Sequence, residues 1–563
     1  MRDILAFLLV LLAASAWAQQ PSPRGTPAGL IAGTITSTAG GPLEGAAVVL
    51  MHARLDDPSH NEEPKTIFAG PGGRYRFDEL EPGIYFLLAS HPGYVVAVSG
   101  SEGLPEGKGK AILLAPNEQQ ELNFSLKPLA SISGSVLDRD GNGLEGFTVT
   151  AERSTYFRGV RTTVTKADAV SDDRGAYIME DLAPGRYYIR ARRPQQDYGQ
   201  ISTLRAIKPG ERDLRLDNTF YPGAAEASGA AVITMEAGRT VDGIDIRMLE
   251  REFFSVSGKV VGPDPDMAGS HVLTSPAERS GAAGASGPIQ EDGSFVLTGV
   301  PAGPAHVVYW HQSDFADGSR TWGSTSIDVR EPLENVIVDI RVQDISGSMR
   351  VEGERELDEL AAAALKRASI RLRSVDGSDN RSNRPGAAGS FTLSDIPRGR
   401  YIVDVDNLYG GPYLKELRLA GQSILDSVVD FTGGFPDGAM EVVVSTDGGV
   451  LNGSLRTKGG EAPQFATITL VPASRKFGHS RLYPTGDADP GGAYEVTGIT
   501  PGRYEVFAWE RIEETAHWNE DFMRPFLTRG KVVEIEEGKT EYLDLDIITA
   551  QEMEEALMRA GLL

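Results

Sequence analysis

The sequence predicts an all-β chain: a tandem array of five antiparallel β-sandwich domains, prealbumin-like or immunoglobulin-like, with a short C-terminal helix. One glycine and aromatic pattern occurs five times, and an opening strand with a central glycine precedes each copy. These central glycines lie 89 to 124 residues apart. Short strands, Gly and Pro turns and units of about 100 residues are typical of β-sandwiches.

In each copy of the pattern, a glycine is followed by an aromatic residue at the second position after it. Apolar residues follow at the fourth and seventh positions, and a second glycine at the tenth. Because side chains alternate along a strand, the aromatic residue and the first apolar residue share one face. Proline near the second glycine predicts a turn into a further alternating strand. The copies are Gly73 to Gly83, Gly175 to Gly185, Gly293 to Gly303, Gly389 to Gly399 and Gly492 to Gly502.

Each copy has an opening strand and most have a closing strand of alternating apolar residues. The opening strands are Ile31-Gly33-Ile35, Ile132-Gly134-Val136, Val256-Gly258-Val260, Ile345-Gly347-Met349 and Leu451-Gly453-Leu455. The closing strands are Leu122-Phe124-Leu126, Ile244-Ile246-Met248, Val336-Val338-Ile340, Val442-Val444 and Leu543-Leu545-Ile547. The next opening strand follows closely, so the linkers are short and we expect a stiff string of domains.

These strands divide the chain into five predicted domains, which we call modules 1 to 5. Helices are expected at residues 354–366, 521–529 and 551–560, and the last should dock on module 5. The predicted segments are a signal peptide (1–18), a disordered leader (19–29), module 1 (30–128), module 2 (129–250), module 3 (251–343), module 4 (344–446), module 5 (447–549) and a C-terminal helix (550–563).

The N-terminal residues predict export. Arg2 precedes an apolar run, and small residues stand at Ala16 and Ala18, as before a signal-peptidase site. The run is shorter than the roughly 20 residues of a spanning helix. We therefore expect cleavage near Ala18 and a secreted, periplasmic or cell-surface protein with no membrane span in the mature chain.

Composition excludes several classes of protein. The formal net charge of −24 disfavours binding to nucleic acid, which needs a basic footprint. The absence of cysteine excludes disulfides, thiolate zinc sites, cysteine nucleophiles and a lipid anchor on cysteine.

The stretch from Gly134 to Gly146, with Ser171 to Tyr177 and Leu182 to Tyr187, resembles the carboxypeptidase regulatory-like domain. The resemblance implies a transthyretin-like sandwich, grouped with carbohydrate-binding-like folds and related to Cna B-type repeats of bacterial surface proteins. It implies an extracytoplasmic setting and no activity of its own. Tandem copies of this kind occur in large predicted exported proteins of soil bacteria such as Acidobacteria. Modules 1, 2 and 5 match best.

No catalytic residues or cofactor are predicted. The chain lacks a Gly-x-Ser-x-Gly nucleophile elbow. His60-x-x-Glu63 and His517-x-x-Glu520 have the spacing of a zinc peptidase motif, but neither is followed by a suitable histidine. A role as an accessory to a metal-dependent peptidase is therefore only a remote alternative.

Two further kinds of site can be considered. Asp138, Asp140 and Asn142 alternate as calcium ligands do, but a hairpin turn explains them equally and the expected glutamate is missing. In Cna B-type domains a lysine can join an asparagine covalently. Lys259 in an opening strand and Asn335 in the closing strand of module 3 are the candidates, and such chemistry needs a buried lysine.

Tryptophan supplies the remaining candidates for binding. Trp310 and Trp509 each stand seven residues after a pattern glycine, at a position that alternation turns away from the core. Exposed indoles stack on sugars or anchor protein partners. The alternative, which the tendency of tryptophan to be buried favours, is packing within the module or against its neighbour.

The sequence therefore predicts a non-catalytic exported scaffold or adhesion-type protein, pictured as a rod of five sandwiches. The alternative is a protein that binds envelope or extracellular polysaccharide, and its acidic surface favours neutral glycans. The expected partner is a protein or a polysaccharide of the cell envelope or extracellular space.

Overall fold

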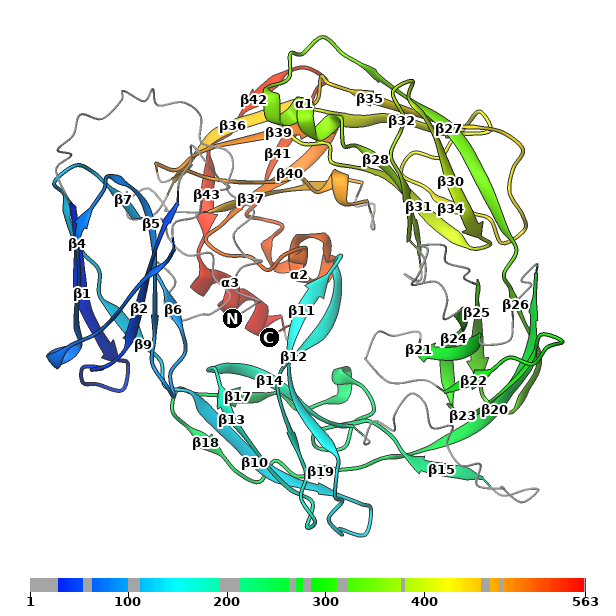
Figure 1. Cartoon of the computed structure of the whole chain (residues 1–563), viewed down its shortest axis with the longest axis horizontal. Helices are drawn as coiled ribbons and strands as arrows, with labels where there is room; N and C mark the ends of the chain where they lie inside the picture. Colours follow the sequence, from blue (N-terminus) through cyan, green and yellow to red (C-terminus); the bar gives the residue numbers. More distant parts are fainter. Residues whose placement is uncertain are drawn as a thin grey trace. The chain divides into compact units, whose positions relative to one another are not determined.

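The computed structural model describes residues 29–53, 63–99, 112–192, 212–262, 270–276, 285–310, 323–375, 380–456, 466–474, 479–489, 491–560 and 562 (Figure 1). The signal peptide and nearly all of the leader lie outside these residues. Strands dominate the described chain, which confirms the predicted all-β class. The chain forms two compact units, residues 1–128 and 129–563. In the described part, no helix is long and apolar enough to cross a membrane.

Each predicted module is built from two sheets, which are joined into one in module 5. In the first, the opening strand lies between the pattern strand, which is antiparallel to it, and the closing strand. In the second, the strand that follows the Pro-Gly turn pairs with a strand from the first half of the module. The apolar faces of the two sheets enclose one hydrophobic cluster in each module.

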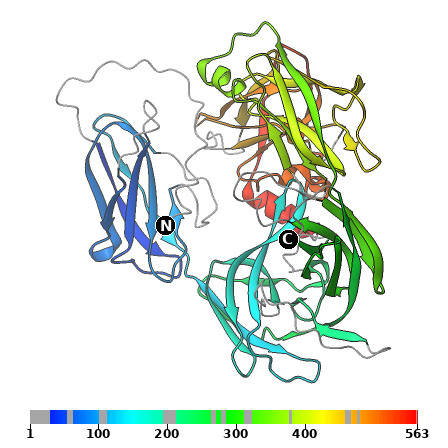
Figure 2. The same cartoon turned by 45° about the vertical axis from the view of Figure 1, so that its right-hand side comes forward.

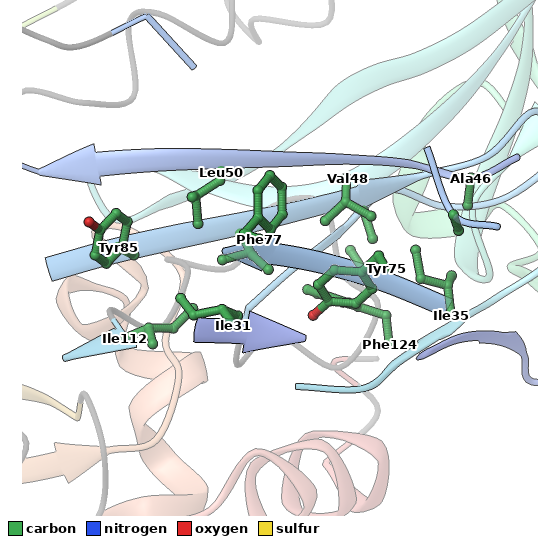
Figure 3. Packing of buried hydrophobic residues seen from close by; sticks show 14 of the residues in the cluster. Ile31, Ile35, Ala46, Val48, Leu50, Tyr75, Phe77, Tyr85, Ile112 and Phe124 are labelled. Carbon is green, nitrogen blue, oxygen red and sulfur yellow. The ribbon is translucent and has the colours of Figure 1, made fainter. Parts of the chain in front are cut away.

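Module 1 shows the arrangement plainly. Tyr75 and Phe77 from the pattern strand pack against Ile31 and Ile35 of the opening strand, with Val48 of the second sheet opposite (Figure 3). Its elements are β1 (Gly29–Ser37), β2 (Ala47–Ala53), β3 (Lys65–Phe68), η2 (Pro71–Gly73), β4 (Arg74–Leu80), β5 (Gly83–Ser90), β6 (Ala97–Val98), β7 (Ile112–Leu114), β8 (Gln119–Glu121) and β9 (Phe124–Leu126).

Module 2 has a long hairpin, β11 and β12, in its second sheet, and its strand β15 joins the first sheet of module 3. Its elements are β10 (Ala130–Leu137), β11 (Thr148–Phe157), β12 (Val160–Val170), β13 (Ala176–Leu182), β14 (Gly185–Arg192), β15 (Asp213–Leu216), β16 (Thr219–Phe220), η3 (Ala227–Gly229), β17 (Ile233–Met235), β18 (Thr240–Val241) and β19 (Ile246–Arg247).

Modules 3 and 4 repeat the plan, and module 4 carries a helix between its opening strand and its second sheet. The elements of module 3 are β20 (Glu250–Val261), β21 (His271–Pro276), β22 (Ser286–Pro288), β23 (Ser294–Pro301), β24 (Gly303–Trp310), β25 (Gly323–Val329) and β26 (Leu333–Asp339). Those of module 4 are β27 (Val342–Glu352), α1 (Glu359–Leu365), β28 (Ser369–Ser374), β29 (Asn380–Asn383), β30 (Ser390–Pro397), β31 (Arg400–Asp406), β32 (Tyr413–Leu419), β33 (Gln422–Ser423), β34 (Val428–Asp430) and β35 (Met440–Ser445).

In module 5 the two sheets are joined, because β43 pairs with both β36 and β40. Its elements are β36 (Gly449–Arg456), β37 (Thr467–Pro472), η5 (Ser480–Leu482), β38 (Thr485–Asp487), β39 (Ala493–Ile499), β40 (Gly502–Trp509), η6 (Ala516–Trp518), α2 (Glu520–Met523), η7 (Arg524–Phe526), β41 (Lys531–Ile535), β42 (Thr540–Tyr542), β43 (Leu545–Ile548) and α3 (Ala550–Arg559).

The repeated glycines and aromatic residues have a common structural reason, seen clearly in module 2. A Cβ on Gly134 would lie 2.1 Å from the carbonyl oxygen of Ile244 in the closing segment. The hydroxyl of Tyr177 donates to that same oxygen at 2.7 Å. Gly175, before the aromatic residue, has a φ of +78°, which favours glycine. The pattern therefore fixes how closely the closing segment approaches the opening strand.

The closing strands differ from the predicted all-antiparallel pairing. In all five modules the closing strand pairs in parallel with the opening strand: β9 with β1, β19 with β10, β26 with β20, β35 with β27 and β43 with β36. Each closing segment returns across the sandwich before it pairs, which reverses its direction relative to a hairpin. The other pairs are predominantly antiparallel.

All three predicted helices are present, but two of them are shorter than the predicted ranges. The helix expected at 354–366 is α1, which begins only after its N-cap, Asp358. The one expected at 521–529 is divided into α2 and the 3-10 turn η7, where Pro525 enters. The terminal helix α3 has a capping box at Thr549, and its buried Met553 and Leu557 dock on module 5 as predicted.

Candidate binding site

The exposed position predicted for Trp509 is wrong. Its side chain is 0% exposed, and its Nε1 donates to the hydroxyl of Thr469 at 2.8 Å. The position does face away from the main core of module 5, but a second apolar cluster covers that face. This cluster contains Phe522, Phe526 and the apolar side of α3. Trp509 is therefore unavailable for stacking on a sugar and fits the packing alternative.

The other tryptophans are in different situations. The backbone of Trp310 ends β24, paired with His271, but its side chain lies outside the described residues, as does all of Trp322. Trp518, which the sequence did not single out for binding, is half-buried and donates to His517 at 3.0 Å.

The calcium candidate forms a hydrogen-bonded hairpin turn. The Asp138 carboxylate accepts from the backbone nitrogens of Asp140 and Asn142 and from the Asn142 side chain, at 2.8 to 2.9 Å. These bonds, chiefly the one from the Asn142 amide, lower the pKa of Asp138. The turn is thus closed without a metal. Among the described residues, no group of three His, Cys, Asp or Glu side chains is placed to hold one.

The proposed cross-link in module 3 lacks its buried setting. Both Lys259 and Asn335 are exposed, and Lys259 is opposite Ile337 in the strand register. The reaction needs a buried lysine, so the exposed Lys259 does not meet its condition.

The second His-x-x-Glu sequence also has a structural explanation. His517 is buried, and burial lowers its pKa to about 4. Its Nε2 accepts from the Trp518 indole, while Glu520 is exposed in the first turn of α2. A buried neutral histidine that holds a tryptophan is a packing residue. His60 lies outside the described residues.

The tip of the β11–β12 hairpin of module 2 contacts module 5. Figures 1 and 2 both place this tip beside α2. The Asn519 side chain donates to the Gly159 carbonyl at 2.7 Å, and the Thr515 hydroxyl donates to the Tyr156 carbonyl at 3.3 Å. The rings of Tyr156 and Phe522 meet edge to face at 5.3 Å. We call this contact the clasp.

The clasp corrects the expectation of a stiff string or rod within residues 129–563. In a string, each domain touches only its chain neighbours, whereas here module 2 meets module 5, more than 350 residues further along. Modules 4 and 5 also contact each other, because Lys415 of module 4 pairs with Glu537 of module 5 at 2.8 Å. Within module 4, the same Lys415 pairs with Glu352 at 3.0 Å.

A cavity of about 310 Å³ lies where the clasp meets module 4. Its walls come from three modules, and its residues are aromatic, charged or hydroxyl-bearing, with one aliphatic side chain, Ile402. They are Tyr156, Phe157 and Arg158 from the hairpin, Arg371, Arg373, Ile402, Asp404 and Asp406 from β28 and β31, and Ser480, Glu514, Thr515 and Trp518 from module 5.

The charged groups of the cavity are paired and partly desolvated. Arg371 lies 2.5 Å from Asp406, and Arg481, only 11% exposed, lies 3.4 Å from Asp404 and also pairs with Asp426. Burial raises the pKa of both Asp404 and Asp406, against the opposing effect of these arginines. Burial likewise lowers the pKa of Arg373. The cavity thus presents donors and acceptors in a weakly hydrated setting.

Sequence reasoning missed this cavity. Arg371 and Arg373 alternate with buried Ile370 and Leu372, so they read as an ordinary solvated face of β28. The sequence did contain one indication of a site: the two outward arginines of β28 pair across the sheet with a strand, β31, that carries two outward aspartates, Asp404 and Asp406. Nothing in the sequence showed that modules 2 and 5 cover this face.

Comparison with known proteins identifies two of the repeats. The model of the carboxypeptidase regulatory-like domain family matches residues 30–127 and 131–217. Modules 1 and 2 are carboxypeptidase regulatory-like domains. The family predicted from the sequence is thus confirmed for these two regulatory-like domains, whereas an origin in Acidobacteria stays a prediction.

Similarity to individual proteins is more remote. Colossin-A of Dictyostelium discoideum is 24% identical over 388 residues, which is 62% of this chain and 3% of colossin-A. The GBS52 minor pilin of Streptococcus agalactiae is 13% identical, covering 40% of this chain and 95% of the pilin, with a TM-score of 0.22. A streptococcal ancillary pilin is 11% identical, covering 56% of this chain and all of the pilin, with a TM-score of 0.19.

Proposed function

We propose that this chain is a non-catalytic scaffold or adhesion-type binding protein of the cell envelope or extracellular space. The observation that supports the proposal most strongly is the use of side chains between modules. The clasp joins module 2 to module 5, and the Lys415–Glu537 pair joins module 4 to module 5. Such fixed multi-module bodies present preorganised surfaces, which lowers the entropic cost of binding.

The proposal is tested by location and capture. We expect N-terminal sequencing of the exported protein to begin at Gln19, and fractionation to place it outside the cytoplasm. A photo-reactive residue at Phe68, 71% exposed on β3, should cross-link one defined envelope partner. A cytoplasmic protein with an uncleaved N-terminus would contradict the proposal.

A second candidate function, polysaccharide binding, is favoured by the cavity. Aromatic side chains beside paired charged groups are the features that bind sugars. The test is affinity electrophoresis of residues 19–563 in gels that contain neutral or acidic polysaccharides or peptidoglycan. Retardation by a neutral polymer is expected, and free migration in every gel would refute this candidate.

A further inference from the structure

The cavity at the clasp has the composition of a site for a small, uncharged, hydroxyl-rich ligand. Its cations, Arg158, Arg371 and Arg373, are balanced by three acidic residues, Asp404, Asp406 and Glu514. A site with equal charges of each sign gives no net attraction to an anion or a cation. The chain as a whole, at −24, repels anions.

We infer that this cavity binds one neutral sugar unit of a glycan, held between modules 2, 4 and 5. The inference deepens the second candidate function and rests on it. A sugar hydroxyl both donates and accepts, so it can bond to a carboxylate and a guanidinium together. Asp406 and Arg371, 2.5 Å apart on adjacent strands, supply such a pair.

The hydrogen-bonding state of the cavity supports this assignment. Within the described residues, Arg371 Nε is buried and has no hydrogen-bond partner. A buried donor without a partner is destabilising, and an accepting ligand oxygen removes that cost. The hydroxyls of Ser480 and Thr515 also line the cavity and can exchange bonds with a polyol.

The aromatic residues supply the apolar contact that a sugar ring needs. Tyr156, Phe157 and Trp518 line the cavity together with the charged strands of module 4. Phe157, at the hairpin tip, is 48% exposed. Sugar rings have an apolar face of C–H groups that packs on aromatic side chains, so a sugar can use these rings and the polar groups of the cavity at once.

The size of the cavity limits the ligand. At about 310 Å³, it is at the lower end of the roughly 300–1,000 Å³ typical of ligand pockets. It therefore suits one terminal unit of a chain rather than a long segment. Because its walls come from three modules, a bound sugar should also stabilise the clasp, since a ligand stabilises the state that binds it.

The experiment is a calorimetric titration of residues 19–563 with neutral di- to tetrasaccharides of glucose, galactose, mannose and N-acetylglucosamine. Oligogalacturonate is the acidic comparison. Two cavity variants, Asp406→Asn and Phe157→Ala, have matched controls at exposed sites of the same chemistry. Asp328→Asn, the control for Asp406→Asn, removes a carboxylate that is ion-paired to Arg330 within module 3. Tyr542→Ala, the control for Phe157→Ala, removes an exposed aromatic ring.

We expect saturable binding of a neutral oligosaccharide, weakened roughly tenfold or more by each cavity variant and unchanged by the controls. Circular dichroism checks that all variants fold. The same variants are also run in the affinity gels described above. If neutral polymers retard both cavity variants as much as the native chain, the inference is wrong and polysaccharide binds at another site. If no neutral oligosaccharide or polymer binds, both the cavity assignment and the polysaccharide-binding function are refuted. Preference for oligogalacturonate would refute the neutral-ligand argument.

Discussion

Replacing Trp509 with alanine should unfold module 5 rather than remove a surface contact. The indole is completely buried in the cluster between β40, α2 and α3. Truncating a buried Trp costs about 3–5 kcal/mol. The variant also leaves the buried Thr469 hydroxyl without its indole donor, which adds about 1 kcal/mol. The expected loss of stability is therefore about 4–6 kcal/mol.

The assay is urea unfolding of the whole exported chain, followed by tryptophan fluorescence and by circular dichroism. With a urea dependence of about 1–3 kcal/mol per M for a domain of this size, the transition of module 5 should move down by at least about 1.3 M. Trp509→Phe keeps most of the packing and should cost far less, about 1–2 kcal/mol.

The matched control is Tyr542→Ala, which removes an aromatic ring that is 77% exposed in the same module. It should leave the transition within about 0.5 kcal/mol of the native chain. Equal midpoints for Trp509→Ala and Tyr542→Ala would refute the burial argument. In that case the indole would again be a candidate for binding.

Three other perturbations have definite expected outcomes. Because burial lowers the pKa of His517 from 6.5 to about 4, the unfolded state binds more protons between these values. The stability of module 5 should fall by up to about 3 kcal/mol as pH drops through this window, and His517→Gln should flatten the pH dependence of the urea midpoint. Tyr177→Phe leaves the Ile244 carbonyl without its donor, and should destabilise module 2 by about 1–2 kcal/mol in the same assay. Excess calcium should leave the melting temperature unchanged, whereas Asp138→Ala, which breaks the turn, should lower it by several degrees.

The repeated pattern could be predicted because its physics is local. Alternation along a strand fixes which residues face the core, and the aromatic and apolar positions of module 1, such as Tyr75 and Phe77, are buried as expected. The opening glycines also followed from spacing alone. The parallel closing strands could not be predicted, because strand alternation carries no information about direction.

The failure at Trp509 has a different cause. Alternation correctly turned the indole away from the main core, but it could not show that a helical insertion covers the outer face. The signal was present in the sequence as apolar residues at helical spacing, Phe522 with Phe526 and Met553 with Leu557. Such a stripe needs a partner surface, and the outer face of β40 was the nearest one.

The clasp was beyond sequence reasoning because it depends on a residue in an unfavourable conformation. Thr515 has a φ of +61°, a left-handed conformation that costs a non-glycine residue of order 1 kcal/mol or more. Its hydroxyl faces Gly159 and donates to Tyr156 across the module boundary. A Cβ on Gly159 would meet the Trp518 side chain at 2.8 Å, so the hairpin tip fits only as glycine. Gly159 also belongs to the two-residue turn of its own hairpin, where Arg158 and Gly159 both have positive φ, at +52° and +75°. Thr515, by contrast, makes its hydrogen bonds across the contact between modules 2 and 5. The left-handed backbone at Thr515 is therefore the local feature for which the clasp supplies a reason.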